Sequence, residues 1–214
     1  MKVKYSKLSL LKWSKLKTLL SFGTKGYLAD IGWIRSFDTG APVDAEGVSL
    51  PWVTYSFIDF IKDRITKKHV IFEFGSGNST LFYAERAKEV VSVEHHQAWY
   101  DKIKSASPKN AELIFCELVP NGAYSKMPLT TQKKYDVIIV DGRDRVNCCK
   151  QAVAALSKNG VVVLDDSERD FYAPGIAFLK KQGFKELAFS GISPGLFYYK
   201  TTSVFYKSDN CLGI

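Results

Sequence analysis

The chain has 214 residues, of which 46% are hydrophobic and 14% aromatic, and it carries a formal net charge of +8. A chain of this length can bury roughly 70% of its unfolded surface around one large core, so we expect one main globular domain. No apolar run approaches the roughly 20 residues that cross a bilayer, and the pattern of a signal peptide is missing. Four cysteines show neither metal-ligand spacing nor a secreted disulfide pattern. We therefore expect a cytoplasmic protein.

The first 26 residues hold much of the excess positive charge, because seven lysines alternate there with leucines and one tryptophan. Such a segment predicts either peripheral contact of residues 1–25 with the anionic inner face of the membrane or a helix packed on the domain. A helical wheel places Lys12 between Leu16 and Leu19, so the apolar face is interrupted. Both interpretations stay open.

The segment DTGAPVDAEGVSLP is rich in turn residues and is predicted to be a loop that ends at Pro51, a residue suited to the start of a helix. Apolar residues from Trp52 to Ile65 then recur at helical spacing. We assign residues 1–69 to an N-terminal basic helical extension with a lid or linker, and residues 70–214 to the main domain.

From Val70 onward, short apolar strands alternate with helices. Strands are predicted at 70–74, 90–94, 112–118, 135–141 and 160–166, and helices at about 78–87, 96–106 and 144–157. The strands are continuous in Val and Ile, as in a parallel sheet that helices cover on both faces. The segment that contains Pro120, Gly122 and Pro128 is predicted to be a loop.

The end of the chain departs from this alternation. A helix at 173–182 is followed by strands at 184–192 and 201–208, and so short a connection requires the two strands to be antiparallel. The predicted fold is therefore α/β, with a doubly wound, mainly parallel, seven-stranded Rossmann-like sheet that ends in an antiparallel hairpin and follows an N-terminal helical extension.

The first predicted strand carries a lone carboxylate, Glu73, and then breaks into glycines. Ligands of doubly wound sheets bind at the carboxyl ends of the strands, beside the point where the strand order reverses. Gly75 and Gly77 would let the backbone turn tightly there and approach a ligand. Glu94 ends the second strand about twenty residues later, where a carboxylate can accept hydrogen bonds from the two hydroxyls of a ribose. This pattern predicts a ligand that contains adenosine.

Charge distinguishes between the adenosine-containing ligands. A pyrophosphate disfavours a carboxylate beside the glycine turn, whereas a ligand with an ammonium and a sulfonium group would be attracted by Glu73. The stretch EFGSGNS resembles the motif E/D-x-G-x-G-x-G of the class I S-adenosylmethionine-dependent methyltransferases, with Ser79 in place of the third glycine. The resemblance covers roughly residues 70–208, including the terminal hairpin.

The resemblance implies a role for each residue of the motif. Glu73 would face the amino acid end of S-adenosylmethionine, Glu94 would hold its ribose, and Glu117, at the end of the third strand, would meet its adenine. The complete set that it implies for cofactor binding is Glu73, Gly75, Ser76, Gly77, Asn78, Ser79, Glu94, His95, Glu117 and Asp141.

Asp141 ends the fourth predicted strand, and Asp165 and Asp166 end the fifth. Neighbouring parallel strands lie about 4.8 Å apart, so the three carboxylates should converge and need a cation or a proton between them. Magnesium or manganese is one solution. The pattern is similar to that of metal-dependent catechol-type O-methyltransferases, although Asp165-Asp166 stands where that family has Asp-Asn.

In the other solution, Arg143, Arg145 or Arg169 neutralises the acids and Asp141 is the general base. We predict Asp141, Asp165 and Asp166 as catalytic residues on either hypothesis. His95 and His96 are rival bases, but their place beside the expected ribose site favours a role in lining the adenine or a place on the surface.

The acceptor is indicated by resemblance alone. Six segments together are similar to small bacterial methyltransferase-like proteins, distantly similar to plant glucuronoxylan methyltransferases: PWVTYSFIDFI, EFGSGNSTLF, SVEHHQAWY, VDGRDR, LDDSER and TTSVFYKS. This resemblance implies O-methylation of a small molecule or saccharide, as in glycan modification. An aminopropyl transferase of the same fold would need an acidic pocket. A nucleic-acid methyltransferase or binding protein is suggested only by the charge. A homodimer is compatible with the sequence.

Overall fold

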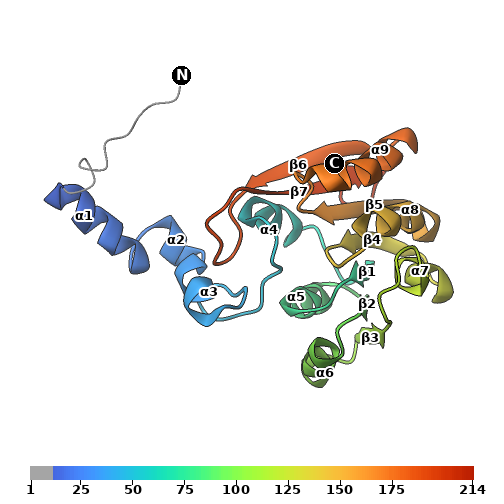
Figure 1. Cartoon of the computed structure of the whole chain (residues 1–214), viewed down its shortest axis with the longest axis horizontal. Helices are drawn as coiled ribbons and strands as arrows, with labels where there is room; N and C mark the ends of the chain where they lie inside the picture. Colours follow the sequence, from blue (N-terminus) through green and yellow to red (C-terminus); the bar gives the residue numbers. More distant parts are fainter. Residues whose placement is uncertain (1–11) are drawn as a thin grey trace.

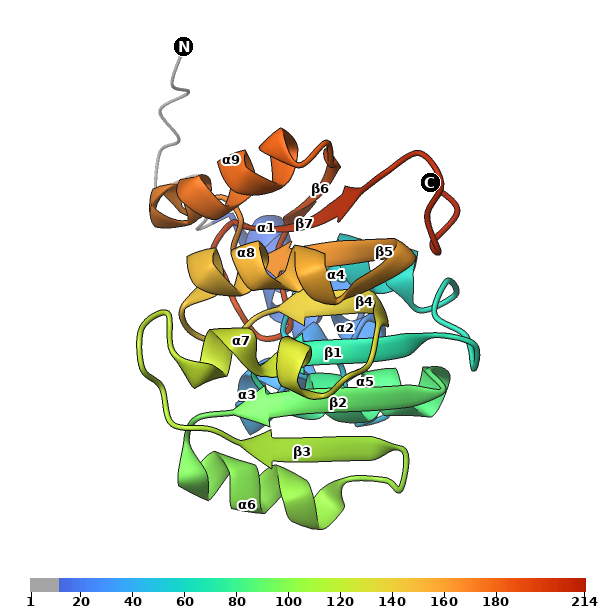
Figure 2. The same cartoon turned by 90° about the vertical axis from the view of Figure 1, so that its right-hand side faces the viewer.

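The computed structural model describes residues 12–214, in which seven strands form one sheet with the order β3-β2-β1-β4-β5-β7-β6 (Figure 2). Strands β1 to β5 are mutually parallel, and β7 runs antiparallel to both of its neighbours. This arrangement confirms the predicted fold class. The strands are β1 (Val70–Phe74), β2 (Glu89–Glu94), β3 (Ala111–Phe115), β4 (Tyr135–Val140), β5 (Leu156–Asp165), β6 (Lys185–Gly191) and β7 (Lys200–Tyr206).

Helices cover both faces of the sheet, as the continuous apolar strands require. Helices α4 and α5 lie on one face, and α7, α8 and α9 lie on the other (Figure 1). Alternate residues of each strand serve the two cores: Ile71 packs with α4 and α5, and Phe72 packs on the opposite side. The helices that pack around the sheet are α4 (Tyr55–Ile61), α5 (Asn78–Arg86), α6 (Gln97–Ala106), α7 (Ala123–Thr130), α8 (Arg145–Ala155) and α9 (Ala173–Lys181).

The strand order reverses between β1 and β4, and the chain brings two glycines together at this point. Gly75 has φ +91°, a conformation that side chains rarely allow, and a Cβ placed on it would lie 3.1 Å from the Cα of Gly142. A Cβ on Gly142 would lie 2.1 Å from the hydroxyl oxygen of Tyr124. The backbones after β1 and β4 therefore pack too closely for side chains at these two positions, and a cleft opens above them.

Helix α7 occupies the segment that was predicted to be a loop, so that prediction was wrong. Its residues Tyr124, Ser125 and Pro128 are buried, and Tyr124 belongs to the core between the sheet and this helical layer. Pro128 lies inside the helix, where it lacks a backbone donor and disfavours helix formation. Burial of one face of a short helix outweighs that local preference.

The N-terminal extension consists of α1 (Trp13–Leu20), a 3₁₀ turn (Ser21–Gly23), α2 (Tyr27–Asp30) and α3 (Trp33–Thr39). The indole nitrogen of Trp33 donates to the carbonyl of Leu196 at 3.0 Å, and that of Trp52 donates to the carbonyl of Pro194 at 2.8 Å. The loop between β6 and β7 is thus attached to the extension.

Helix α1 buries none of its residues and stands away from the sheet (Figure 1). The expectation that this segment packs on the domain is therefore not met by α1, whereas α3 buries Trp33 and Ser36. Residues 1–11, which belong to the predicted basic segment, lie outside the described residues. Among residues 12–214, no helix has the length and apolar character needed to cross a membrane.

Candidate functional site

A cavity of about 580 Å³ opens at the carboxyl ends of β1, β2 and β4, where the strand order reverses. This is the position at which open α/β sheets bind ligands. The structure brings six of the twelve predicted residues together here, from the loops that follow β1, β2, β4 and β5. The cavity is lined by Gly75, Ser76, Glu94, His95, His96, Trp99, Asp141, Gly142, Arg143, Arg145, Asp166 and Arg169.

Glu94 ends β2 and is a buried carboxylate whose two oxygens both accept hydrogen bonds. Its Oε1 accepts from the backbone nitrogens of His95 and His96 at 2.8 and 2.9 Å. Its Oε2 accepts from the backbone nitrogen of Ser76 at 3.1 Å and from the Ser76 hydroxyl at 3.3 Å. Three backbone donors therefore fix the carboxylate at the cavity wall. The Ser76 hydroxyl can rotate away, which would let a ligand hydroxyl donate in its place.

Glu73 lies behind the glycine loop and lines neither this cavity nor the ones described below. Its Oε2 accepts from the hydroxyls of Thr80 at 2.6 Å and Ser92 at 2.7 Å. Burial raises the pKa of Glu73 to about 7, although hydrogen bonds from nearby hydroxyls oppose the shift. The backbone nitrogen of Gly77 donates to Thr80 Oγ1 at 3.1 Å. Glu73 therefore holds the glycine loop in place through Thr80. Thr80 stands where the dinucleotide-binding fingerprint has its third glycine.

A second cavity, of about 250 Å³, lies between the loop at 39–42 and the glycine loop, and Ser76, Gly77, Asn78 and Ser79 contribute to its wall. The side-chain nitrogen of Asn78 donates to the carbonyl of Pro42 at 2.8 Å, which holds the N-terminal extension against the first turn of α5. Trp99 lines both cavities, and its indole nitrogen donates to the carbonyl of Ser76. The extension thus closes one side of the site.

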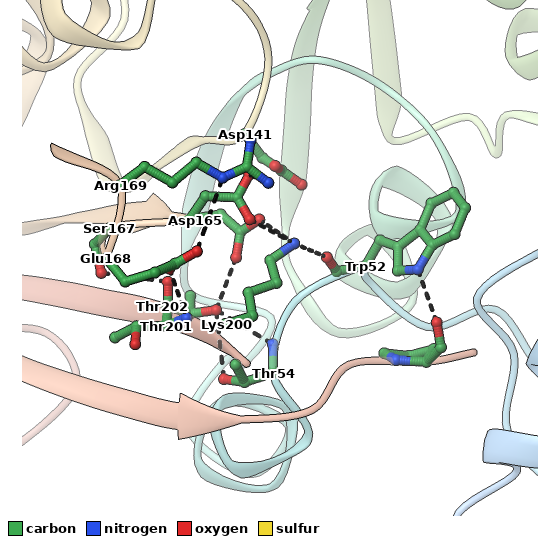
Figure 3. A network of polar contacts seen from close by, with 12 residues as sticks. Trp52, Thr54, Asp141, Asp165, Ser167, Glu168, Arg169, Lys200, Thr201 and Thr202 are labelled. Carbon is green, nitrogen blue, oxygen red and sulfur yellow. Dashed lines mark hydrogen bonds and ion pairs between the residues drawn. The ribbon is translucent and has the colours of Figure 1, made fainter. Parts of the chain in front are cut away.

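The three predicted acids do converge, and cations lie between them. Figure 3 shows Lys200 and Asp165 of this cluster. The ammonium of Lys200, at the start of β7, lies 2.6 Å from Asp165 Oδ2 and 3.2 Å from Asp166 Oδ1, and it donates to the carbonyl of Trp52 at 2.8 Å. Arg145 lies 2.9 Å from Asp141 Oδ1 and 3.1 Å from Asp166 Oδ2. Three acids are therefore held together by two buried cations.

Arg169 adds a further contact to Asp166 at 3.1 Å. The acids are thus neutralised by side chains, as the second of the two hypotheses predicts. Arg145 and Arg169 are confirmed as two of the neutralising partners. Arg143 is exposed and makes no ion pair within residues 12–214. Lys200 was not predicted at all, because it directly precedes the strand expected at 201–208.

The proposed metal site of Asp141, Asp165 and Asp166 is not supported by this geometry. No group of three or more His, Cys, Asp or Glu side chains in the described part of the chain could hold a metal ion. The physical reason is that Lys200 and Arg145 already occupy the space between the carboxylates and compensate their charge. A divalent ion would have to displace both cations.

Asp141 is the one of the three acids that lines all three cavities of the cleft, and its side chain is partly exposed. It lines the cavity of about 580 Å³, the cavity of about 250 Å³ and a third cavity of about 350 Å³. The third cavity is lined by Trp52, Asp141, Arg145, Asp166, Arg169, Leu196, Tyr198 and Lys200. Burial raises the pKa of Asp141, although Arg145 and Lys200 oppose the shift.

Asp165 is completely buried and lines none of these cavities. Burial raises its pKa well above the ordinary value, and the charge of Asp141 adds to this effect. Thr202 of β7 donates to Asp165 Oδ1 at 2.8 Å, so both oxygens of this carboxylate contact the neighbouring strand or its lysine. Asp165 therefore acts on the site through Lys200, while Asp141 faces the ligand space.

The remaining predicted residues divide into two groups. His95 and His96 line the cavity of about 580 Å³, and Nδ1 of His96 accepts from the backbone nitrogen of Trp99 at 3.3 Å as the N-cap of α6. Glu117 follows β3, is exposed and lines none of the three cavities. The structure thus places His95 in the cleft and Glu117 outside it.

No protein-family model and no curated protein matches the chain in sequence. Solved structures do match it. A methyltransferase-like protein from Silicibacter pomeroyi DSS-3 is 21% identical, with a TM-score of 0.55 over 74% of this chain and 89% of that chain. A putative caffeoyl-CoA O-methyltransferase from Staphylococcus aureus is 13% identical, with a TM-score of 0.55 over 89% and 98%. A putative methyltransferase from Streptococcus mutans in complex with SAH is 14% identical, with a TM-score of 0.51 over 70% and 94%.

These similarities establish the fold: the chain has the Rossmann-like fold of the class I methyltransferases. A shared fold hosts many chemistries, so the reaction has to be argued from the residues of the cleft.

Proposed function

We propose that the protein is an S-adenosylmethionine-dependent methyltransferase that methylates a hydroxyl oxygen of a small molecule or saccharide. The observation that carries this proposal is the position of Asp141, a partly accessible carboxylate that lines all three cavities of the cleft. One carboxylate can thereby face both a methyl donor and an acceptor hydroxyl.

The donor fits the cavity at the carboxyl ends of β1 and β2. Glu94 offers a fixed carboxylate for the ribose hydroxyls, and the close packing of Gly75 against Gly142 leaves the floor free of side chains. The complex of the matched Streptococcus mutans protein with SAH supports a donor of this class. Glu73 would act indirectly, by holding the glycine loop through Thr80 rather than by touching the donor.

The chain would supply positioning and proton transfer. S-adenosylmethionine, when bound, supplies an electrophilic methyl group on a sulfonium, and the acceptor oxygen must be held about 3–3.5 Å from it. Asp141 would accept the proton of the acceptor hydroxyl, and its raised pKa suits this task because a stronger base holds the proton more readily. Arg145 orients the carboxylate through Oδ1 and compensates its charge.

The acceptor fits the third cavity, where two aromatic side chains meet polar ones. Trp52 and Tyr198 line this cavity together with Arg169 and Lys200. Ring faces pack against the apolar faces of sugars, and the charged groups can bind hydroxyls or a carboxylate. This combination supports a saccharide or a small polar molecule as the acceptor.

Two alternatives of the same fold fit less well. An aminopropyl transferase would need uncompensated acids to bind a polyamine, whereas Arg145, Arg169 and Lys200 neutralise the acids of this cleft. A nucleic-acid methyltransferase would show binding that weakens steeply with salt, because phosphate contacts release counterions. Titration with single-stranded and duplex nucleic acid at two salt concentrations distinguishes this alternative.

The proposal is tested by soaking crystals of the protein with S-adenosylhomocysteine and, separately, with NAD. We expect adenosine density beside Glu94, with the sulfur end directed toward Asp141. An empty cleft at saturating S-adenosylhomocysteine, or NAD bound in its place, would overturn the assignment.

A further inference from the structure

Helix α1 (Trp13–Leu20) presents large apolar side chains to solvent. None of its residues is buried in the described structure, and it projects away from the sheet and its helical layers (Figure 1). Trp13 is 75% exposed and Leu20 is 71% exposed. Transferring such side chains out of water would stabilise a complex, so this surface is suited to a partner.

A helical wheel of the sequence places Lys12 within the apolar face, but helix α1 begins only after Lys12. Lys12 is the N-cap, with extended backbone (φ −64°, ψ 125°), and does not belong to the helical surface. At 3.6 residues per turn, the apolar residues of α1 fall within one arc of about 120°. Lys15 and Lys17 stand at the two edges of this arc. The arc consists of Trp13, Leu16, Leu19 and Leu20, and Ser14 and Thr18 lie opposite.

This arrangement matches a helix that lies in a membrane interface. Lysines at the edges of an apolar arc can bury their methylene stems and extend their ammonium groups to lipid phosphates. Residues 12–29 contain no Asp or Glu, so no acid opposes attraction to anionic headgroups. Eight residues of helix extend about 12 Å, far less than the roughly 30 Å of a bilayer core, so α1 would lie on the surface.

We infer that α1 docks the protein on anionic phospholipid surfaces, with the arc from Leu19 to Trp13 in the interface and Lys15 and Lys17 on headgroup phosphates. The geometry favours lipid over the two other partners. A nucleic acid would pair with the lysines but leave Trp13 and Leu20 in water. A second copy of α1 would bring like charges together along both edges of the apolar arc. This inference does not depend on the proposed methyltransferase activity.

The test is flotation of the full chain with vesicles of phosphatidylcholine mixed with phosphatidylglycerol, at about 0.1 M salt, where the Debye length is about 10 Å. We expect the protein to float with these vesicles and not with phosphatidylcholine alone. Lys15→Gln/Lys17→Gln should weaken partitioning about 30-fold, because each lysine near an anionic surface contributes about a factor of five to six. The matched control Lys109→Gln/Lys126→Gln removes the same charge from exposed positions elsewhere and should float like the wild type.

A second variant, Trp13→Ser/Leu20→Ser, tests the apolar arc without changing the charge and should also lose flotation. Since α1 buries no residue, both α1 variants should keep the circular dichroism spectrum and unfolding midpoint of the wild type. The inference is overturned if the wild type does not float, or if the control loses as much binding as the α1 variants. It is equally overturned if sedimentation shows a dimer that Leu20→Ser dissociates, or if Lys15 and Lys17 are needed for RNA binding instead.

Discussion

Replacing Glu73 by Gln should stabilise the protein at pH 8 and change it little at pH 5. Glu73 is only 1% exposed, and burial raises its pKa to about 7, above the ordinary value of 4.5. Between these two values the folded chain holds a proton that the unfolded chain releases. The contribution of this carboxyl to stability is therefore complete below about pH 4.5 and is lost as the pH rises to about 7.

The magnitude follows from the size of the shift. A difference of about 2.5 pKa units corresponds to about 3 kcal/mol of lost stability once the carboxylate is ionised. Gln keeps the shape and can still accept from Thr80 and Ser92. Its amide nitrogen would replace Oε1, which has no partner among the described residues, at a cost of about 1 kcal/mol. The net expectation is a gain of about 2 kcal/mol at pH 8 and about zero at pH 5.

Urea unfolding at both pH values measures this difference directly. In thermal unfolding, the gain at pH 8 should raise the midpoint by roughly 4–8 °C for a chain of this size. Glu85→Gln is the control, because Glu85 is an exposed residue in the last turn of α5 and should show no pH-dependent gain. If Glu73→Gln instead destabilises the protein at pH 8, the carboxylate is satisfied in its ionised form and the raised pKa is wrong.

Three further substitutions test the site. Lys200→Met should lower the free energy of unfolding by about 3–5 kcal/mol in urea titration, because it leaves the buried Asp165 without its counter-charge. A loss that stays the same in an Asp165→Asn background would contradict this reason. Gly142→Ala should be strongly destabilising, since its Cβ would meet the Tyr124 hydroxyl, and Tyr124→Phe should partly restore stability in the same titration; a neutral Gly142→Ala would mean that the loops are not packed as described. Asp141→Asn should abolish methyl transfer in a radiolabel assay while the affinity for S-adenosylhomocysteine stays within a few-fold, and a fully active variant would remove Asp141 from the mechanism.

Sequence reasoning succeeds where one local pattern decides the outcome. The alternation of apolar strands and helices predicts the doubly wound sheet, and the short turn around Pro194 predicts the antiparallel hairpin. Placing Glu94 and Asp141 at strand ends is enough to bring them to one cleft, because parallel strands end at the same edge.

It fails where the outcome depends on neighbours that are distant in sequence. Lys200 reaches Asp165 because β7 pairs with β5 in a register that places Thr202 opposite Asp165. Lys200 precedes Thr202 by two residues and therefore lies on the same face of β7. Neither the strand order nor this register is readable from one sequence. A lysine at the start of an apolar strand is the one signal that could have been noticed, since its burial requires an acid partner. Helix α7 is missed for a related reason, because only the burial of Tyr124 outweighs the local effect of Pro128.

The central claim is that the cleft holds an adenosine-bearing methyl donor against Glu94, and isothermal titration calorimetry with S-adenosylhomocysteine tests it most directly. We expect the wild type to bind S-adenosylhomocysteine and not NAD, and Glu94→Ala to bind it at least about tenfold more weakly, because two charge-assisted hydrogen bonds to the ribose are lost. Equal affinities of Glu94→Ala and the wild type, or no heat of binding for the wild type at all, would contradict the claim.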